Sequence, residues 1–326
     1  MQAFQVTTFG EGGHLVQIDT PKPAADEVLL RIEACGLNFA DILMEKGQYQ
    51  ETPEPPFTLG MEVAGIVEET GAEVSHLKPG QRVALFAGSG GLAEYGCFPA
   101  RRCLPLPDEM SFETAAAFQI AYGTSHLALI RRARLQAGET VLVLGAAGGV
   151  GLTAVELARL SGARVVAVAR GADKLEVARK AGADVLIDSA TDDLTAIVKD
   201  LGGADVVYDP VGGAPFKAAL RACKPEARVV VIGFASGDIP QIPANIILVK
   251  NITVIGHYWG GYLRFAPQVL TDSLNDLIGM YEAGRLHPHV SHVLPLARAG
   301  DALDLLRARK STGKVVVRPQ PEAGRN

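Results

Sequence analysis

Residues 141–155 have the composition of a phosphate-binding turn. Val141–Leu144 are apolar and predict a buried strand, and a glycine-rich turn and a helical pattern follow. Gly148 would let the backbone approach a pyrophosphate, and Gly151 would let the helix pack closely against the strand. The N–H groups at the start of such a helix attract an anion. These features predict a dinucleotide cradle, with a plain strand–helix turn as the alternative. Its contacting residues are expected to be Ala147, Gly148, Gly149 and Val150.

The next apolar run, Ala163–Arg170, indicates which dinucleotide the cradle would take. A site selective for NAD carries Asp or Glu at the end of this strand, where the carboxylate binds the ribose 2′-hydroxyl. Here Ala169 takes that place, and Arg170 and Lys174 follow it. Two cations favour a 2′-phosphate and therefore NADPH, although Asp173 lies between them. Two solvated loop charges are the alternative interpretation.

Composition limits the classes of partner. The 326 residues are 48% hydrophobic and 21% charged, which suits about two packed domains. A net charge of −5 gives no electrostatic reason to expect nucleic acid or an anionic membrane. We find no apolar run of the roughly 18 residues that a membrane span needs. The start of the sequence lacks a signal-peptide pattern, and its four cysteines show no pairing pattern, so we expect a reduced, cytoplasmic protein.

The pattern of elements changes along the chain. Residues 1–118 contain short strand-like runs divided by Pro- and Gly-rich turns, which predicts a β-rich domain. Residues 119–256 alternate apolar strands with helical stretches, as in a doubly wound parallel Rossmann sheet. Residues 257–326 exceed what such a sheet needs, so we expect them to return to the first domain. The predicted fold class is α/β.

Six segments in this order resemble one family. They are Gly36–Asp41, Leu59–Gly65, Gly90–Tyr95, Ala146–Gly151, Tyr208–Gly213 and Gly313–Val317. The chain resembles the medium-chain dehydrogenase/reductase superfamily and, within it, the zinc-free quinone oxidoreductases. The resemblance implies a GroES-like catalytic domain, a Rossmann domain and a cleft between them. It also implies homodimers or homotetramers that pair edge strands, for which Asn251–Ile255 is the candidate.

The resemblance also implies that no metal takes part. Zinc-dependent members hold their catalytic zinc with a Cys and a His in two of these segments, where this chain has Asn38 and Met61. An amide and a thioether are poor zinc ligands. A second feature, the close spacing of His287, His289 and His292, is typical of metal sites. Pro288 favours an extended loop there instead, so we expect no metal site.

Without a Lewis acid, hydride transfer needs an acceptor that is already electron-poor, such as a quinone or a conjugated enone. Positioning of the reactants can supply about 7–11 kcal/mol, whereas a general acid adds roughly 10²–10⁴-fold. We therefore expect an enzyme, an NADPH-dependent quinone oxidoreductase, in which no single side chain is indispensable. Two alternatives stay open: an enoyl-thioester reductase, and a non-catalytic NADPH-binding protein with a structural or regulatory role.

The remaining candidate residues lie at positions that match the motifs of this family. The resemblance places Asn38, Asp41 and Tyr49 in the catalytic cleft, with Asn38 also near the cofactor. Turn capping is the alternative for Asn38, and simple packing is the alternative for Tyr49. Tyr258, Trp259 and Tyr262 would wall the pocket of a flat acceptor, unless they lie at a seam between domains or subunits. Further cofactor contacts are expected from Thr124, His126, Ser189, Gly233, Phe234, Ala235, Arg309 and Lys314.

Overall fold

The computed structural model describes residues 1–320, which fold as two compact units. The first unit contains Met1–Ile120 and the chain from Pro288 onward, and the second contains Ala121–His287. The predicted return to the first domain at residue 257 therefore differs from the structure, where the chain returns at Pro288. Residues 321–326 of the expected catalytic domain lie outside the described part of the chain.

The first unit is built from two antiparallel-rich sheets. The smaller sheet has the order β2-β1-β4, and the larger has the order β15-β16-β3-β5-β6-β8, with β7 paired to β3. The strands are β1 (Gln2–Val6), β2 (Gly13–Gln17), β3 (Glu27–Gly36), β4 (Phe57–Thr58), β5 (Glu62–Thr70), β6 (Arg82–Phe86), β7 (Tyr95–Pro99), β8 (Leu104–Pro105), β15 (Val290–Pro295) and β16 (Lys314–Arg318). The helices are α1 (Phe39–Glu45), η1 (Ala100–Arg102), α2 (Phe112–Ala116), η3 (Leu296–Arg298) and α11 (Ala299–Arg307). This β-rich unit was predicted from its short strands and turns.

The second unit is a parallel sheet of six strands in the order β11-β10-β9-β12-β13-β14. Its strands are β9 (Thr140–Leu144), β10 (Arg164–Ala169), β11 (Val185–Asp188), β12 (Ala204–Asp209), β13 (Cys223–Val231) and β14 (Thr253–Gly256). Its helices are α3 (Gln119–His126, which begins at the end of the first unit), η2 (Leu127–Arg132), α4 (Gly149–Leu160), α5 (Ala172–Lys180), α6 (Leu194–Asp200), α7 (Gly213–Ala222), α8 (Ala244–Lys250), α9 (Tyr262–Phe265) and α10 (Pro267–Glu282). The predicted doubly wound fold is confirmed.

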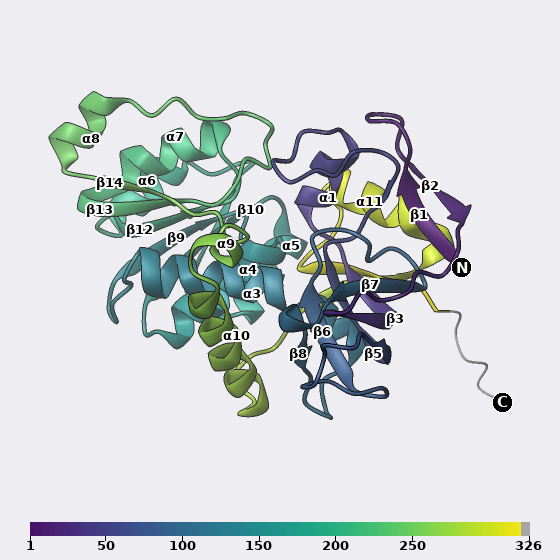
Figure 1. Ribbon diagram of the computed structural model, residues 1–326. Helices are drawn as coiled ribbons and strands as arrows, with labels where there is room; N and C mark the ends of the chain where they lie inside the picture. The colour runs from purple at the N-terminus through teal and green to yellow at the C-terminus, as the bar shows by residue number, and fades with distance from the viewer. Residues whose placement is uncertain (321–326) are drawn as a thin grey trace. The chain divides into compact units, whose positions relative to one another are not determined.

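Helices cover both faces of this sheet: α6, α7 and α8 lie on one face, and α3, α4 and α10 lie on the other (Figure 1). Burial on both faces explains why the strands read as continuous apolar runs. Every residue of β9 is buried, and Leu142, Val207 and Phe216 belong to the core between the sheet and its helices. Helix α10 belongs to this unit, where Leu270, Leu274 and Leu277 are buried and Ser273 lies 2.8 Å from the His126 Nδ1 atom of α3.

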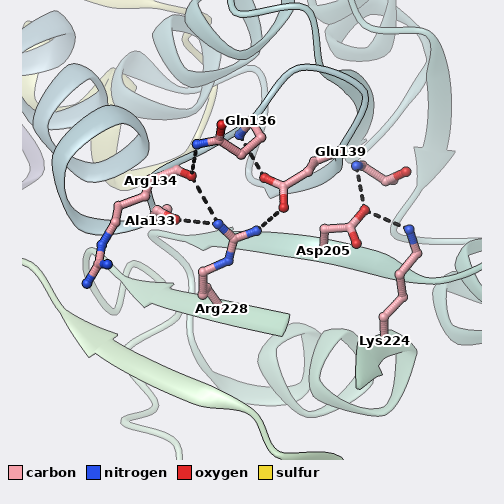
Figure 2. A network of polar contacts seen from close by, with 8 residues as sticks. Ala133, Arg134, Gln136, Glu139, Asp205, Lys224 and Arg228 are labelled. Carbon is pink, nitrogen blue, oxygen red and sulfur yellow. Dashed lines mark hydrogen bonds and ion pairs between the residues drawn. The ribbon is translucent and has the colours of Figure 1, made fainter. Parts of the chain in front are cut away.

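Polar side chains join the amino ends of the parallel strands (Figure 2). The Arg228 guanidinium on β13 donates to the carbonyl oxygen of Ala133 at 2.5 Å and pairs with the Glu139 carboxylate. The Asp205 carboxylate accepts hydrogen bonds from the Thr140 amide at 2.8 Å and from the Lys224 ammonium at 2.7 Å. These bonds hold β9, β12 and β13 in register at the edge opposite to the glycine-rich turn.

Strand β14 is the last strand in the order of the parallel sheet. On α8, which precedes it, Leu248 is 77% and Val249 is 80% exposed. Exposed apolar side chains near a free strand edge are typical of association surfaces. Pairing of Asn251–Ile255 with a second chain stays a prediction, and a monomeric particle mass from light scattering would contradict it. Among the described residues, no helix is both long enough and apolar enough to cross a bilayer.

Candidate functional site

The turn between β9 and α4 brings backbone groups into close contact. Gly145 adopts a φ of 61°, a conformation that glycine reaches without strain. A Cβ atom at position 151 would lie 2.2 Å from the carbonyl oxygen of Gly145, so only glycine allows this packing. At position 148 the same oxygen would be 3.4 Å away, and Gly148 is exposed. The two predicted roles of glycine, helix packing and open backbone, therefore fall on Gly151 and Gly148.

Helix α4 begins at this turn, and its N-cap residue has no side chain that could cap the first N–H groups. Gly148 is its N-cap residue and supplies no capping hydrogen bond. The first N–H groups of a helix have no acceptor within the helix, and together with the helix dipole they favour an anion. Ala147–Val150, the predicted contact residues, lie at this position. The open cradle and its uncapped helix fit the pyrophosphate of a dinucleotide.

The predicted 2′-phosphate residues come from neighbouring strand ends. Arg170 is exposed directly after β10, and Lys174 lies in the first turn of α5. The amide of Ser189, which follows β11, donates to the carbonyl oxygen of Ala169 at 2.9 Å. The parallel register of β10 and β11 therefore places these three residues at one corner of the sheet.

Sequence reasoning missed a carboxylate at the same corner. Asp188 is the register partner of Ala169, although it lies 19 positions later in the sequence. Its two oxygens accept hydrogen bonds from the amides of Gly171 at 3.1 Å and Ala190 at 2.9 Å. The carboxylate is thereby bound to two neighbouring backbone turns, and its negative charge opposes the attraction of the two cations for a phosphate. Only the register of β11 against β10 could have revealed it.

The loops after β12 and β13 meet at the carboxyl edge of the sheet. The buried Asp209 carboxylate accepts hydrogen bonds from the amides of Val211 at 2.8 Å and Gly212 at 2.9 Å, and burial raises its pKa. The amide of Ala235 donates to the carbonyl oxygen of Pro210 at 3.0 Å. The predicted segment Gly233–Ala235 is thus fixed against the β12 loop, at the edge where such sheets bind ligands.

The aromatic segment after β14 packs largely into the second unit. Trp259 and Tyr262 are only 4% and 5% exposed, and a Cβ atom at Gly123 would lie 2.6 Å from the Trp259 indole nitrogen. Burial lowers the pKa of the neighbouring His257 to about 4, so its imidazole is neutral. The role of Tyr258, Trp259 and Tyr262 as a pocket wall stays a prediction. The exposed ring beside them is Phe265, 4.7 Å from Tyr262 between ring centroids, which sequence reasoning did not name.

Two predicted cofactor residues lie on helix α3. Thr124 is buried. The His126 Nδ1 atom is 2.8 Å from the Ser273 hydroxyl of α10, and burial lowers the pKa of the imidazole. These contacts hold the His126 ring against α10, so its contact with a cofactor stays a prediction.

A buried charge cluster occupies the first unit. The Lys314 ammonium donates to the Asn38 amide oxygen at 2.7 Å and to the Glu62 carboxylate at 2.9 Å. The Asn38 amide nitrogen in turn donates to Glu62 at 3.3 Å and to the Gly36 carbonyl oxygen at 3.2 Å. The second Glu62 oxygen accepts the amide of Ile120 at 2.9 Å. An ammonium can only donate hydrogen bonds, so the Asn38 atom that contacts Lys314 must be the amide oxygen, and the amide nitrogen points to Glu62 and Gly36.

The other candidates of this unit differ in their contacts. The Asp41 oxygens accept hydrogen bonds from the amides of Asn38 at 2.7 Å and Gly60 at 3.2 Å, and burial raises its pKa to about 6. These bonds give Asp41 a role at the start of α1. Tyr49 is half-buried, and Arg309 is exposed with a φ of 53°. Their functional roles stay predictions.

The donor chemistry of this cluster does not suit a divalent metal. An amide oxygen and one carboxylate already surround an ammonium, whose charge would repel a second cation placed there. Elsewhere, the closely spaced histidines separate: His287 bonds to Glu156, His289 to Thr312 and His292 to Ser291. Within residues 1–320, no three His, Cys, Asp or Glu side chains group as a metal site.

Comparison with known proteins identifies the family. Residues 24–108 match the alcohol dehydrogenase GroES-like domain, and residues 149–274 match the zinc-binding dehydrogenase domain. A quinone oxidoreductase-like protein 2 homolog of Nematostella vectensis is 40% identical over 92% of this chain and 84% of its own length. The chain belongs to the quinone oxidoreductase-like group of the medium-chain dehydrogenase/reductase superfamily.

Two solved structures of this group resemble the chain over 98% of its length and 100% of their own. The quinone oxidoreductase of Thermus thermophilus, also solved in complex with NADPH, is 37% identical with a TM-score of 0.85. The NADPH complex of Escherichia coli quinone oxidoreductase is 29% identical with a TM-score of 0.90. The predicted family is therefore confirmed.

Removing the Lys314 charge should destabilise the protein, because Glu62 is fully buried and would lose its cation. We expect Lys314→Met to lower the free energy of unfolding by about 3–5 kcal/mol, measured by urea denaturation. Adding Glu62→Gln should restore part of the loss. Lys310→Met, at an exposed position of the same segment, is the control. A Lys314→Met protein that unfolds at the wild-type urea concentration would show that Lys314 does not stabilise the buried Glu62 carboxylate.

Proposed function

We propose that the protein transfers hydride from NADPH to quinones or conjugated enones without a metal ion. The observation that carries the proposal is the uncapped glycine cradle between β9 and α4, in a chain whose structural relatives were solved with NADPH. When bound, NADPH would supply the hydride, and the protein would supply binding and orientation. Ala147–Val150 would hold the pyrophosphate through backbone N–H groups.

The preference for NADPH is supported by the charges at the β10 tip. Arg170 and Lys174 would attract the 2′-phosphate, and the Ser189 hydroxyl lies at the same corner. Asp188 acts against them, but its oxygens already accept two backbone hydrogen bonds. We propose that Gly233, Phe234 and Ala235 lie near the nicotinamide, because their loop follows β13 at the carboxyl edge. Thr124, His126, Arg309 and Lys314 are proposed as further cofactor contacts.

The metal-free character is supported by the charge cluster of the first unit. Asn38 replaces a zinc ligand of the superfamily, and the Lys314 ammonium is already bonded to both Asn38 and Glu62. Without a Lewis acid, catalysis depends on alignment and on an acceptor that is electron-poor. We propose that Asn38 and Tyr49 contact the acceptor, that Asp41 shapes the loop that presents Asn38, and that Tyr258, Trp259 and Tyr262 line the pocket.

A panel of acceptors tests the activity. We expect steady NADPH oxidation, followed at 340 nm, with 1,4-benzoquinone and with alkenals, because both accept hydride without metal activation. Rates with enoyl-CoA esters and simple ketones should be at least tenfold lower. Faster turnover of enoyl-CoA than of any quinone would instead assign an enoyl-thioester reductase. Tight NADPH binding without turnover of any acceptor would contradict the proposal and indicate a binding protein.

Charge reversal on α5 tests the cofactor preference. We expect Lys174→Glu to raise the KM for NADPH by about 10–100-fold, the loss of one charge-assisted hydrogen bond, and to change the KM for NADH less than threefold. Lys180→Glu, at the other end of the same helix and 71% exposed, is the matched control. An unchanged KM for NADPH in Lys174→Glu would remove Lys174 from the phosphate site.

A further inference from the structure

The chain passes between its two units twice, and one carboxylate lies at both passages. The first passage is at residues 120–121 and the second at residues 287–288. The Tyr122 hydroxyl donates to one Glu156 oxygen at 2.6 Å. The His287 amide donates to the other at 2.8 Å, and the His287 imidazole Nδ1 lies 3.1 Å from that same oxygen. Each passage is therefore bonded to Glu156 within two residues of where it enters or leaves the second unit.

The environment of Glu156 shields its bond to Tyr122 from water, whereas the His287 side chain is 79% exposed. Glu156 is 9% exposed and Tyr122 is 2% exposed, so water cannot readily replace either partner. Burial, with the neighbouring Glu156 charge, raises the pKa of Tyr122, which keeps the phenol protonated and able to donate. A carboxylate offers two separate acceptor oxygens, and here each serves a different passage.

Glu156 also belongs to the helix that forms the cradle. Helix α4 runs from Gly149 to Leu160, and its first turn faces the proposed pyrophosphate. Two further bonds join α4 to the first passage: the Thr153 hydroxyl donates to the Ala121 carbonyl oxygen at 2.9 Å, and the Ser125 hydroxyl donates to the Val150 carbonyl oxygen at 2.8 Å. The described hydrogen bonds from α4 to the second passage all end on Glu156.

We propose that Glu156 is a positioning residue for hydride transfer, because it couples the cradle helix to both chain passages. Ordering of α4 by a bound dinucleotide would restrain residues 119–126 and 284–290 together, through one carboxylate. Glu156 touches neither reactant in this proposal, so its loss should change the rate of the chemical step more than the affinity for the cofactor. The catalytic part of this inference rests on the proposed function, whereas the restraint of the two passages does not.

Hydrogen–deuterium exchange of the full chain tests the restraint. We expect Glu156→Leu to speed exchange at least fivefold in peptides covering both passages, because the His287 amide and the Tyr122 hydroxyl each lose their hydrogen bond to Glu156. Tyr122→Phe should speed exchange at the first passage only. Glu176→Leu, a matched substitution on α5, should leave both passages unchanged. Wild-type exchange at both passages in folded Glu156→Leu would overturn the proposal.

Kinetics then test the positioning role. With NADPH bound, Glu156→Leu should retain the wild-type protection of peptide 145–152 and a KM for NADPH within threefold, while kcat falls at least tenfold. Loss of cradle protection, or an unchanged kcat, would overturn the positioning role. Failure of the proposed function is distinguishable, because it would appear as wild-type protein that neither gains cradle protection from NADPH nor oxidises it. The exchange of the ligand-free variants would still decide whether Glu156 restrains both passages.

Discussion

The buried ion pair between Lys314 and Glu62 is the constraint on which the first unit depends. It joins the start of β16 to the start of β5, and the same carboxylate holds the amide at the beginning of α3. Burial of two charges is costly, so such a pair persists only where geometry and further hydrogen bonds satisfy both groups. Asn38 makes such hydrogen bonds to both Lys314 and Glu62, and these bonds fix the orientation of its amide. A cation thus contacts Asn38, the position at which the resemblance places a zinc ligand in related dehydrogenases, and this contact supports the proposed chemistry without a Lewis acid.

In the second unit, helix α4 has three separate roles. Its first turn is the proposed anion site, its Gly151 packs closely against Gly145 in the preceding turn, and its Glu156 accepts bonds from two distant segments. Gly151 lies in the first turn and Glu156 one turn later, so the bonds of Glu156 leave the first turn open. The polar network around Arg228 and Asp205 fixes the opposite edge of the sheet and leaves the carboxyl edge to its loops (Figure 2).

Much of this fold is predictable from the sequence because its signals are local. Strands buried on both faces give continuous apolar runs, so Val141–Leu144 and Ala163–Arg170 lie within one residue of the bounds of β9 and β10. The unit of helix α10 differs from the expectation that residues 257–326 all return to the first domain, because periodicity shows that a helix has an apolar face and not what that face packs against. The later return of the chain follows from that packing.

The site is less predictable because its decisive contacts join distant positions. The cradle glycines lie within seven consecutive residues, 145–151, and were identified from the sequence. In contrast, Glu62 and Lys314 are 252 positions apart, and Glu156 and His287 are 131 positions apart. Asp188 beside Ala169 emerges only from strand register. The three closely spaced histidines bond to three different partners, Glu156, Thr312 and Ser291, which their spacing in the sequence could not indicate.

The central claim, hydride transfer in a site whose positive charge comes from a side chain, is tested most directly by metal content measured together with turnover. We predict that purified protein, dialysed against EDTA, retains its full rate of NADPH oxidation with 1,4-benzoquinone while elemental analysis finds well under one zinc per chain. Stoichiometric zinc whose removal abolishes the reaction, and whose return restores it, would contradict the account.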